Sequence, residues 1–347
     1  MSTLPNSTPA VDDVTDSDTT EISYYVIEIV FAVFAIFGNL TVIIIYLLEP
    51  RLRNTLSNIY LISLAVSDFC MGAIAIPIIL IALQGIPRSF PACLFLLSIL
   101  VMIDVASVFA LLAMTLDRYY SISRPLRYCV VVTKSRAVAG ALLAWFVAFL
   151  FIVPMLAGWH NGPPSQPQCF FLEVVSLQYM TFLFFAAILA PFFLMCFVYT
   201  QIYLIIRKQL KQMRAVHDIG NRLRSTQLSS NPDRESRTQR TQQPSTNDVT
   251  RENQSSQDQK ATEFRRIKRE WRTALFFAFL MLFFFASWVP IFLIDALIYF
   301  GVYNIPQNVI NFCVFLSHFN SAFNPFLYTM KSDFRKALKR MVTCNAR

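Results

Sequence analysis

Acidic side chains interrupt several long apolar runs of this sequence. Glu28, Asp68, Asp104 and Asp295 lie in stretches otherwise made mostly of Leu, Ile, Phe, Val and Ala. A carboxyl group in hydrocarbon surroundings must be protonated, paired with a cation or hydrogen-bonded. These acids are therefore candidates for binding a metal cation, a charged ligand group or a polar partner on another helix.

A second chemical group, Asp117-Arg118-Tyr119, ends the apolar run that begins near Cys93. The run between Cys93 and Arg118 is roughly 37 Å long as a helix, and the hydrocarbon core of a bilayer is about 30 Å thick. One helix can therefore hold Cys93 at one membrane face and Arg118 at the other. Arg118 can pair with Asp117 and, across a bundle, with Glu270, which can also be read as a solvated charge in a basic run.

The composition requires these groups to sit on membrane helices. The chain has 347 residues, of which 55% are hydrophobic and 15% charged, and its mean hydropathy is +0.49. A soluble domain would be nearer a quarter charged. The sequence predicts an all-α, seven-transmembrane helix bundle, with spans near 24–48, 57–82, 92–116, 136–157, 177–206, 272–300 and 306–330.

Charge sets the expected topology. The first 23 residues carry acids but no Lys or Arg, and the connections after the second, fourth and sixth spans carry one basic residue, Arg88. The other connections are basic, which places the N-terminus outside and the C-terminus inside. The net charge of +9 then belongs to cytoplasmic loops near anionic lipid, so we expect no nucleic-acid partner.

The chain divides into five segments with different compositions. Residues 214–262 contain no aromatic residue and many Gln, Ser, Thr, Asn and Arg, which predicts disorder. The expected segments are an extracellular tail (1–23), helices one to five (24–213), a disordered third cytoplasmic loop (214–262), helices six and seven (263–331), and a short amphipathic eighth helix with the tail (332–347).

Two cysteines and two modification sites follow from this topology. Cys93 and Cys169 both fall outside the cell, where disulfides form, so we expect them to pair. Of the adjacent Phe170 and Phe171, we expect one ring to hang over the helix bundle and one to pack the loop. Asn6 begins a glycosylation acceptor pattern, and the tail residue Cys344 is either a palmitoylation site or a free thiol.

An enzyme or a transporter is a poor interpretation. No nucleophile or metal-ligand constellation and no inverted repeat is visible in the sequence. We therefore expect no catalytic residues and no cofactor.

Taken together, the motifs resemble those of rhodopsin-like (class A) G-protein-coupled receptors over about residues 24–342. The motifs are Gly38-Asn39, Asp68, Asp117-Arg118-Tyr119, Trp145, Trp288-Val289-Pro290 and Asn324-Pro325-Phe326-Leu327-Tyr328. A nearer resemblance is to adenosine receptors, carried by stretches such as 125–128, 133–136, 154–159, 207–213 and 316–321. The resemblance implies a receptor that transduces an extracellular ligand signal to a heterotrimeric G protein.

The resemblance also implies a ligand pocket, but several positions depart from the adenosine-receptor pattern. Asp295 and Leu183 each stand where that family has an asparagine. Asp104 stands in place of a threonine, Phe292 in place of a histidine and Leu172 in place of a glutamate. An ionised aspartate only accepts hydrogen bonds, whereas an asparagine also donates them. The expected ligand-binding residues are Glu28, Leu100, Asp104, Phe171, Met180, Trp288, Ile291, Phe292, Asp295, Ser317 and His318.

Two further sets of residues match the class. The sodium site would contain Asp68, Ser107, Trp288, Asn320 and Asn324, and the G-protein switch Asp117, Arg118, Tyr119, Tyr199, Glu270 and Tyr328. The implied partners are a G protein with a change in cAMP, a small-molecule agonist (adenosine or another molecule), arrestin, receptor kinases and membrane lipid. A biogenic amine is the alternative ligand, although amine receptors carry their acid at the position of Leu100, one turn from Asp104.

Overall fold

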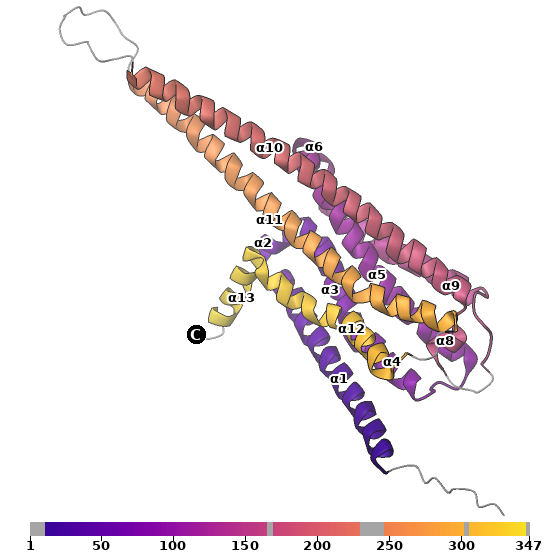
Figure 1. The fold of residues 1–347 in the computed structure, drawn as a ribbon. Coiled ribbons are helices and arrows are strands. Elements are labelled where there is room, and N and C mark those ends of the chain that lie inside the picture. Colours follow the sequence, from indigo (N-terminus) through magenta and orange to yellow (C-terminus); the bar gives the residue numbers. More distant parts are fainter. Residues whose placement is uncertain (1–10, 165–168, 230–245, 302–304, 345–347) are drawn as a thin grey trace, which may run out of the picture.

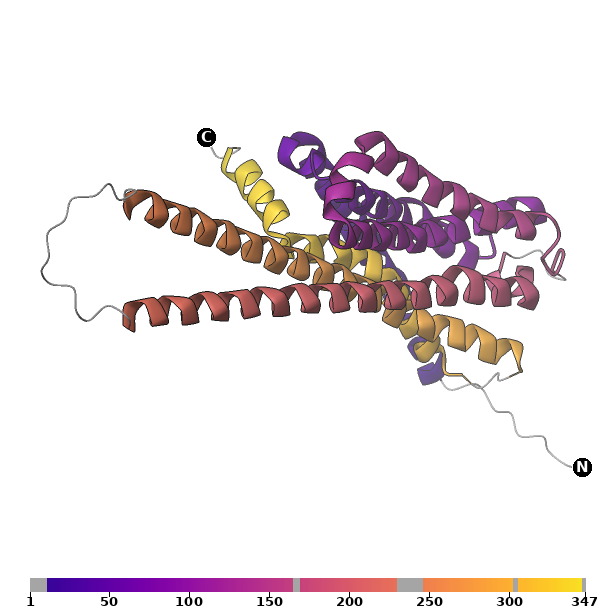
Figure 2. The same ribbon diagram turned by 90° about the horizontal axis from the view of Figure 1, so that it is seen from above.

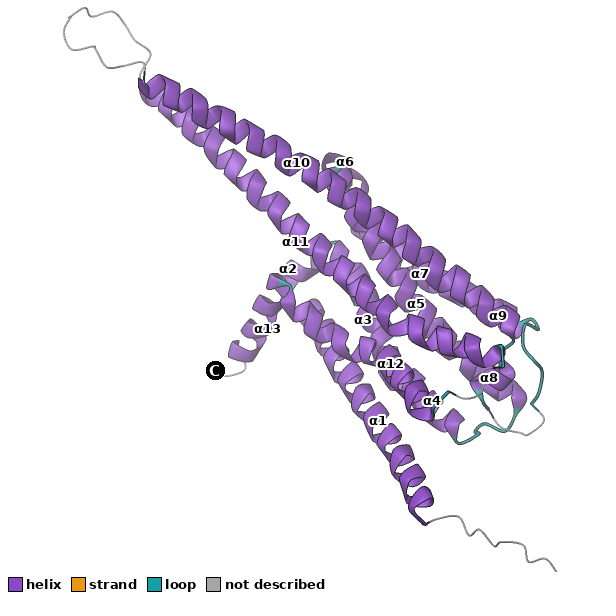
Figure 3. Cartoon of the chain, viewed as in Figure 1, coloured by secondary structure: helices purple, strands orange, loops and turns teal. Residues whose placement is uncertain are grey.

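The computed structural model describes residues 11–164, 169–229, 246–301 and 305–344, which are almost entirely helical (Figure 3). Within these residues, seven helical columns lie side by side (Figure 1). The columns are α1 (Val11–Leu48), α3–η1–α4 (Ser57–Cys70, Met71–Ala75, Ile76–Leu83), α5 (Phe90–Ser123), α7 (Lys134–Leu156), α9–η2–α10 (Leu177–Phe182, Leu183–Leu189, Ala190–Ser229), α11 (Thr246–Tyr299) and α12 (Gln307–Met330). The predicted all-α bundle is confirmed.

Helix α5 is the central column. It contacts α3, α7, α10 and α11. In the most apolar stretch of α5, 67% of the residues are buried, whereas the corresponding share in α7 is 28%. Helix α1 packs against α12 and α3, while α11 packs between α10 and α12. The close approach of α1 to α12 depends on Gly38, because an added Cβ there would lie 2.7 Å from Cγ of Pro325.

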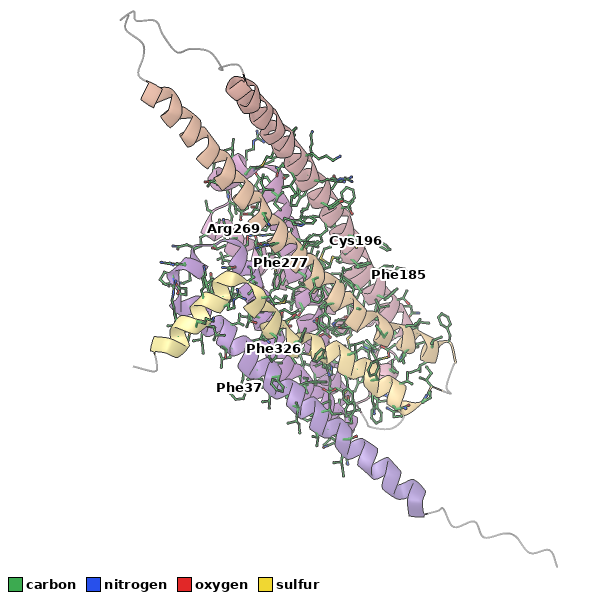
Figure 4. All side chains as sticks on the ribbon, turned by 60° about the vertical axis from the view of Figure 1, so that its left-hand side comes forward. Phe37, Phe185, Cys196, Arg269, Phe277 and Phe326 are labelled. Atoms are coloured by element: carbon green, nitrogen blue, oxygen red, sulfur yellow. A yellow bond between two sulfur atoms is a disulfide. The ribbon has the colours of Figure 1, made fainter. Side chains whose placement is uncertain are left out.

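The outer surface of the bundle is apolar. Phe37, Phe185 and Phe326 are all more than half exposed and lie on the periphery (Figure 4). Six of the described helical columns are long and apolar enough to cross a membrane. The seventh, α12, carries the predicted polar strip with Ser317, Asn320 and Asn324, all buried, which lowers its average hydropathy. An apolar rim around buried polar groups suits a bundle surrounded by lipid.

Two columns contain a wide, π-helical turn, and each turn ends two residues before a proline. The turn Met71–Ala75 precedes Pro77, and the turn Leu183–Leu189 precedes Pro191. Proline has no N–H to donate to the preceding turn and its ring collides with the carbonyl there. The wider turn relieves both effects without ending the helix.

Short helices complete the connections. Helices α2 (Pro50–Arg53) and α6 (Pro125–Val131) both begin with proline, whose fixed φ suits the first helical turn. Helix α8 (Phe171–Val174) lies between α7 and α9, and α13 (Ser332–Cys344) follows α12. The predicted eighth helix therefore exists, and an ion pair of 3.0 Å between Arg340 and Glu49 ties it to the end of α1.

One expected segment differs in part from the structure. Helix α10 continues to Ser229 and α11 begins at Thr246, so part of the segment 214–262 that was expected to be disordered is helical (Figures 1 and 2). Helix α1 begins at Val11, and its part that is long and apolar enough to cross a membrane, Ile22–Leu48, agrees with the span expected near 24–48. No proline occurs in 214–229 or 246–262, and Arg, Gln, Lys and Glu are good helix formers, so the chain can continue the adjoining helices.

Candidate functional site

A disulfide closes one end of the bundle, which we call the disulfide end. Cys93 at the start of α5 is bonded to Cys169, with their Cα atoms 5.5 Å apart, so the predicted pairing is confirmed. The loop that follows is fixed to α11, because the Tyr299 hydroxyl donates to the carbonyls of Leu172, at 3.4 Å, and Val175. Phe171 packs against the buried apolar cluster at this end. The loop thus holds a ring against the opening of the bundle.

Aromatic side chains of α11 line the interior below this loop. The rings of Trp288 and Phe292 lie 6.2 Å apart, and Phe184 lies 5.7 Å from Phe292. Both α11 rings also pack against the buried cluster of α5. Of the other expected pocket residues, Leu100 and Met180 are buried, and Ile291 is partly buried. These side chains are apolar or aromatic, as most side chains that line small-molecule sites are.

Two carboxyl groups in this half of the bundle have no counter-ion. Neither Asp104 on α5 nor Asp295 on α11 makes a hydrogen bond or an ion pair with any described residue, and Oδ1 of Asp104 is fully buried. Asp104 is about 16 Å of helix from Cys93, and Asp295 is one turn from Tyr299, nearer the loop. The two acids therefore lie at different depths rather than forming one charge pair.

A third acid is already paired. Oε2 of Glu28 on α1 lies 2.7 Å from Nδ1 of His318 on α12, and both side chains are buried. The neighbouring Ser317 hydroxyl donates to the Val314 carbonyl of its own helix at 2.7 Å. Glu28 therefore has the partner on another helix that the sequence favoured, and the pair joins the first column to the last.

The fourth acid, Asp68 on α3, lies in a buried polar centre. The Asn324 amide donates to its Oδ2 at 2.8 Å, whereas Oδ1 of Asp68 and Oδ1 of Asn320 are buried without a hydrogen-bond partner among the described residues. The Ser107 hydroxyl donates to the Ile103 carbonyl at 3.3 Å, so its oxygen keeps lone pairs free. Carboxylate, amide and hydroxyl oxygens are the ligands that hard cations take, and Oδ1 of Asp68 and Oδ1 of Asn320 have no hydrogen bond that would compete with a cation.

The opposite end of α5, which we call the arginine end, holds a network of charges. Arg118 lies 3.4 Å from Asp117 on its own helix and 3.6 Å from Glu270 on α11, so both predicted ion pairs are present. The second distance is too long for a hydrogen bond. The Glu270 side chain is 27% exposed overall, but the Oε2 that faces Arg118 is buried without a hydrogen-bond partner among the described residues.

Asp117 has two partners that the sequence did not indicate. The Ser57 hydroxyl on α3 donates to its Oδ2, and the Tyr128 hydroxyl on α6 donates to its Oδ1 at 2.9 Å. Burial and the nearby Asp117 charge raise the pKa of Tyr128 above its ordinary value, so the phenol remains a donor. In the sequence, Pro125 indicates that a helix begins near Tyr128, but it does not indicate that this helix contacts Asp117.

The tyrosines of the expected switch come from three columns, α5, α10 and α12. Tyr199 on α10 accepts a hydrogen bond of 3.3 Å from Thr115 of α5, and Tyr119 packs in a small apolar cluster between α5, α10 and α11. Tyr328 is fully buried, and its hydroxyl has no partner among the described residues. Arg118 itself is buried, so the arginine end is closed in this structure.

Two expected modification sites lie outside the described residues. Asn6 precedes the first described residue, and although Cys344 ends α13, its side chain is not among those described.

The geometry agrees with the comparison to known proteins. The chain matches the family described as 7 transmembrane receptor (rhodopsin family) over residues 38–328. It therefore belongs to the rhodopsin family of seven-transmembrane receptors, and it is a multi-pass membrane protein of a receptor family rather than of an enzyme class.

Among individual proteins, the chain is similar to several adenosine receptors. Adenosine receptor A2a of Homo sapiens is 29% identical over 336 residues, which cover 92% of this chain and 72% of that receptor. Adenosine receptor A3 of Canis lupus familiaris is 30% identical over 319 residues, covering 89% and 87%. Adenosine receptor A2b of Gallus gallus is 27% identical over 350 residues, covering 94% and 90%.

Proposed function

We propose that this receptor lies in the plasma membrane with its N-terminus outside, binds a small extracellular ligand and activates a heterotrimeric G protein, changing cAMP. The observation that carries this proposal is the contact between Arg118 on α5 and Glu270 on α11 at the arginine end, 3.6 Å apart. It joins two helices across a buried face. Separating them would uncover Arg118, Tyr199 and Tyr328 for a helix of the partner.

The ligand acts from the disulfide end. An agonist lying between the Cys169 loop and Trp288 favours the arrangement in which α11 moves away from α5 at the arginine end. The shift cannot exceed the difference between the ligand's affinities for the two arrangements. Pro290 interrupts the helical hydrogen bonds between pocket and switch, which makes it a suitable hinge.

Adenosine is the first ligand to test. The similarity to adenosine receptors supports it, as do Phe171, Ser317 and His318, which match that family's pattern. We propose that Phe171 stacks on the base and that Ser317 and His318 contact the ribose. The departures at Asp104 and Asp295 predict an altered binding mode.

The test is a cAMP titration in intact cells. Adenosine should give a saturable rise or fall over vector-transfected cells, with the effect lost in Phe171→Ala and His318→Ala. Glu173→Gln serves as the matched control, because Glu173 lies on the same loop but is exposed. No response at high micromolar adenosine, from a receptor detected at the cell surface, would reject adenosine as the ligand.

An amine is the second candidate, and one observation favours it. Asp104 and Asp295 have no cation among the described residues, and aromatic faces such as Trp288 attract ammonium groups. For a cationic ligand, Asp104→Asn and Asp295→Asn should each abolish potency. For a nucleoside, Asp295→Asn should preserve or improve potency, because an amide can donate to a ring nitrogen.

The centre at Asp68 fits a sodium ion. Asp68, Asn320 and Ser107 would supply oxygen ligands, Asn324 would orient the carboxyl group, and Trp288 would close the site toward the ligand. The bound charge would satisfy the unpartnered oxygens of Asp68 and Asn320. Raising sodium against N-methylglucamine at constant ionic strength should lower agonist affinity in the wild type and leave Asp68→Asn unaffected. An equal effect in both would reject the site.

The remaining partners follow from the same proposal. On α13, Phe334 and Ala337 are buried while Arg335 and Lys336 are exposed, which supports contact with anionic lipid. Arrestin and receptor kinases would act on the opened arginine end.

Glycosylation of Asn6 would place the N-terminus outside, and a mobility shift after glycosidase treatment, absent in Asn6→Gln, would test it. Incorporation of a palmitate analogue that is lost in Cys344→Ser would test acylation.

A further inference from the structure

Two cations contact one buried ring at the arginine end. The guanidinium carbon of Arg118 lies 5.7 Å from the ring centroid of Phe277, and the ammonium nitrogen of Lys331 lies 4.8 Å from it. Phe277 is on α11 and is only 1% exposed (Figure 4). A cation within about 6 Å of a ring centroid is attracted by the ring face, most strongly where water is excluded. The ring therefore attracts charges from two other parts of the bundle.

Lys331 is held in place for this contact. It is the single residue between the end of α12 at Met330 and the start of α13 at Ser332, and its backbone is extended. Its ammonium group donates to Oδ1 of Asn58 at 3.1 Å. The amide of Asn58, which is buried on α3, in turn donates to the Leu52 carbonyl at 2.9 Å. The amide orientation is thus set, and its oxygen faces the lysine.

Arg118 approaches the same helix by two routes. Glu270 and Phe277 are seven residues apart on α11, so they lie on one face, two turns from each other. Arg118 contacts the carboxylate of the first and the ring of the second. Because the carboxylate contact of 3.6 Å is too long for a hydrogen bond, the buried ring of Phe277 is a second contact that holds α11 to Arg118.

We propose that Asn58, Lys331, Phe277 and Arg118 form a latch that keeps α11 in the closed position at the arginine end. Moving α11 away would take the ring of Phe277 from both cations at once and would uncover a buried aromatic side chain. This latch rests on the proposed function, since it regulates the same opening between α5 and α11. It adds Lys331, at the α12–α13 junction, to the residues that set the resting activity.

The first test measures activity without ligand. Binding of a non-hydrolysable GTP analogue is measured in membranes that express each variant, normalised to surface receptor. Lys331→Met removes the cation and keeps the length of the side chain, whereas Phe277→Leu keeps an apolar side chain and removes the ring. Each should raise basal activity about tenfold, equivalent to about 1.4 kcal/mol in the closed–open equilibrium. Lys331→Arg should stay near the wild type.

Two comparisons separate the latch from general damage. Lys134→Met makes the same change at an exposed position at the start of α7 and should leave basal activity unchanged. If the lysine and the ring act through one contact, the double variant Phe277→Leu/Lys331→Met should match the larger single effect rather than their sum. Additive effects, or basal activity of Lys331→Met equal to that of Lys134→Met, would overturn the proposal.

A second measurement does not depend on any G protein. Spin labels are placed on Cys129 of α6, which is exposed, and on Arg269→Cys of α11, in a background whose other free cysteines are replaced by serine. Lys331→Met and Phe277→Leu should each shift the label distances of the purified receptor toward a longer population. If the distances lengthen but no GTP analogue binds, G-protein coupling fails and the latch stands. Unchanged distances in both variants would reject the latch itself.

Discussion

The hydrogen bond between Tyr128 and Asp117 should stabilise the contact of α6 with the bundle by an amount that can be measured. Tyr128→Phe removes only the hydroxyl that donates to Oδ1 of Asp117 at 2.9 Å, and the Asp117 side chain is 3% exposed. A hydrogen bond to a charged acceptor contributes about 1.5–3 kcal/mol, and we take the lower end because this bond is only partly buried. We expect α6 to open locally about tenfold more often, which corresponds to about 1.4 kcal/mol.

Hydrogen exchange reports this opening directly. Backbone amides of α6 should exchange about tenfold faster in Tyr128→Phe, with the exchange of α7 unchanged. Tyr120→Phe is the matched control. The ring of Tyr120 lies 6.0 Å from that of Tyr128 and is tilted by 56° to it, and no hydrogen bond joins its hydroxyl to the described residues. Equal exchange in the two variants would refute the reasoning, because the hydroxyl would then contribute nothing beyond its ring.

The pH dependence of this contact has a definite sign. Burial first, and then the charge of Asp117, raise the pKa of Tyr128 above its ordinary value of 10.0. The protonated phenol is therefore favoured in the folded protein, and its contribution to stability is fully present below pH 10.0. It is lost only as the pH rises through the higher folded-state pKa. The difference in α6 exchange between wild type and Tyr128→Phe should stay constant from pH 6 to pH 9, once intrinsic exchange rates are corrected for.

Three other substitutions test the packing of the bundle. Gly38→Ala should destabilise the purified receptor by about 1–3 kcal/mol, because the new Cβ would lie 2.7 Å from the rigid ring of Pro325; an unchanged melting temperature would contradict this close contact. Trp145→Phe should cost about 1 kcal/mol or more, because the indole donates to the Ser63 hydroxyl at 3.1 Å, and thermal unfolding in detergent measures it. Cys169→Ser should cost about 2–5 kcal/mol and reduce surface expression, and normal expression and stability would show that the loop holds without its disulfide.

The seven columns and the disulfide could be predicted from sequence because each depends on a short-range or one-dimensional signal. Long apolar runs give the columns, and the distribution of basic residues places Cys93 and Cys169 on one side. The partners of Arg118 could be anticipated in part. Asp117 is its neighbour in the sequence, whereas Glu270 lies in a basic run and was favoured as a partner only by the resemblance to class A receptors.

Contacts made by ordinary residues could not be predicted in this way. Ser57, Tyr128 and Lys331 are common residue types in connections, and nothing in their spacing distinguishes a buried contact from an exposed side chain. The same holds for Phe277, one of 33 phenylalanines, whose two cationic neighbours come from distant parts of the chain. The limits of the segment 214–262 were misjudged because composition reports the lack of a core, not the ability of a helix to continue past the membrane.

The wide turn Leu183–Leu189 changes how positions on the fifth column must be counted. An extra residue in one turn rotates the part of the helix before it by about 100° relative to the part after it. Counting outward from Tyr199 in steps of 3.6 therefore assigns the wrong side chains to the interior above the turn. Leu183 is buried and lies at the start of this turn. A residue on this side of the turn that matches a residue of another receptor by position in the sequence can therefore point in a different direction. The choice of ligand can consequently change when this turn is gained or lost, because the helix before the turn rotates although its residues stay the same.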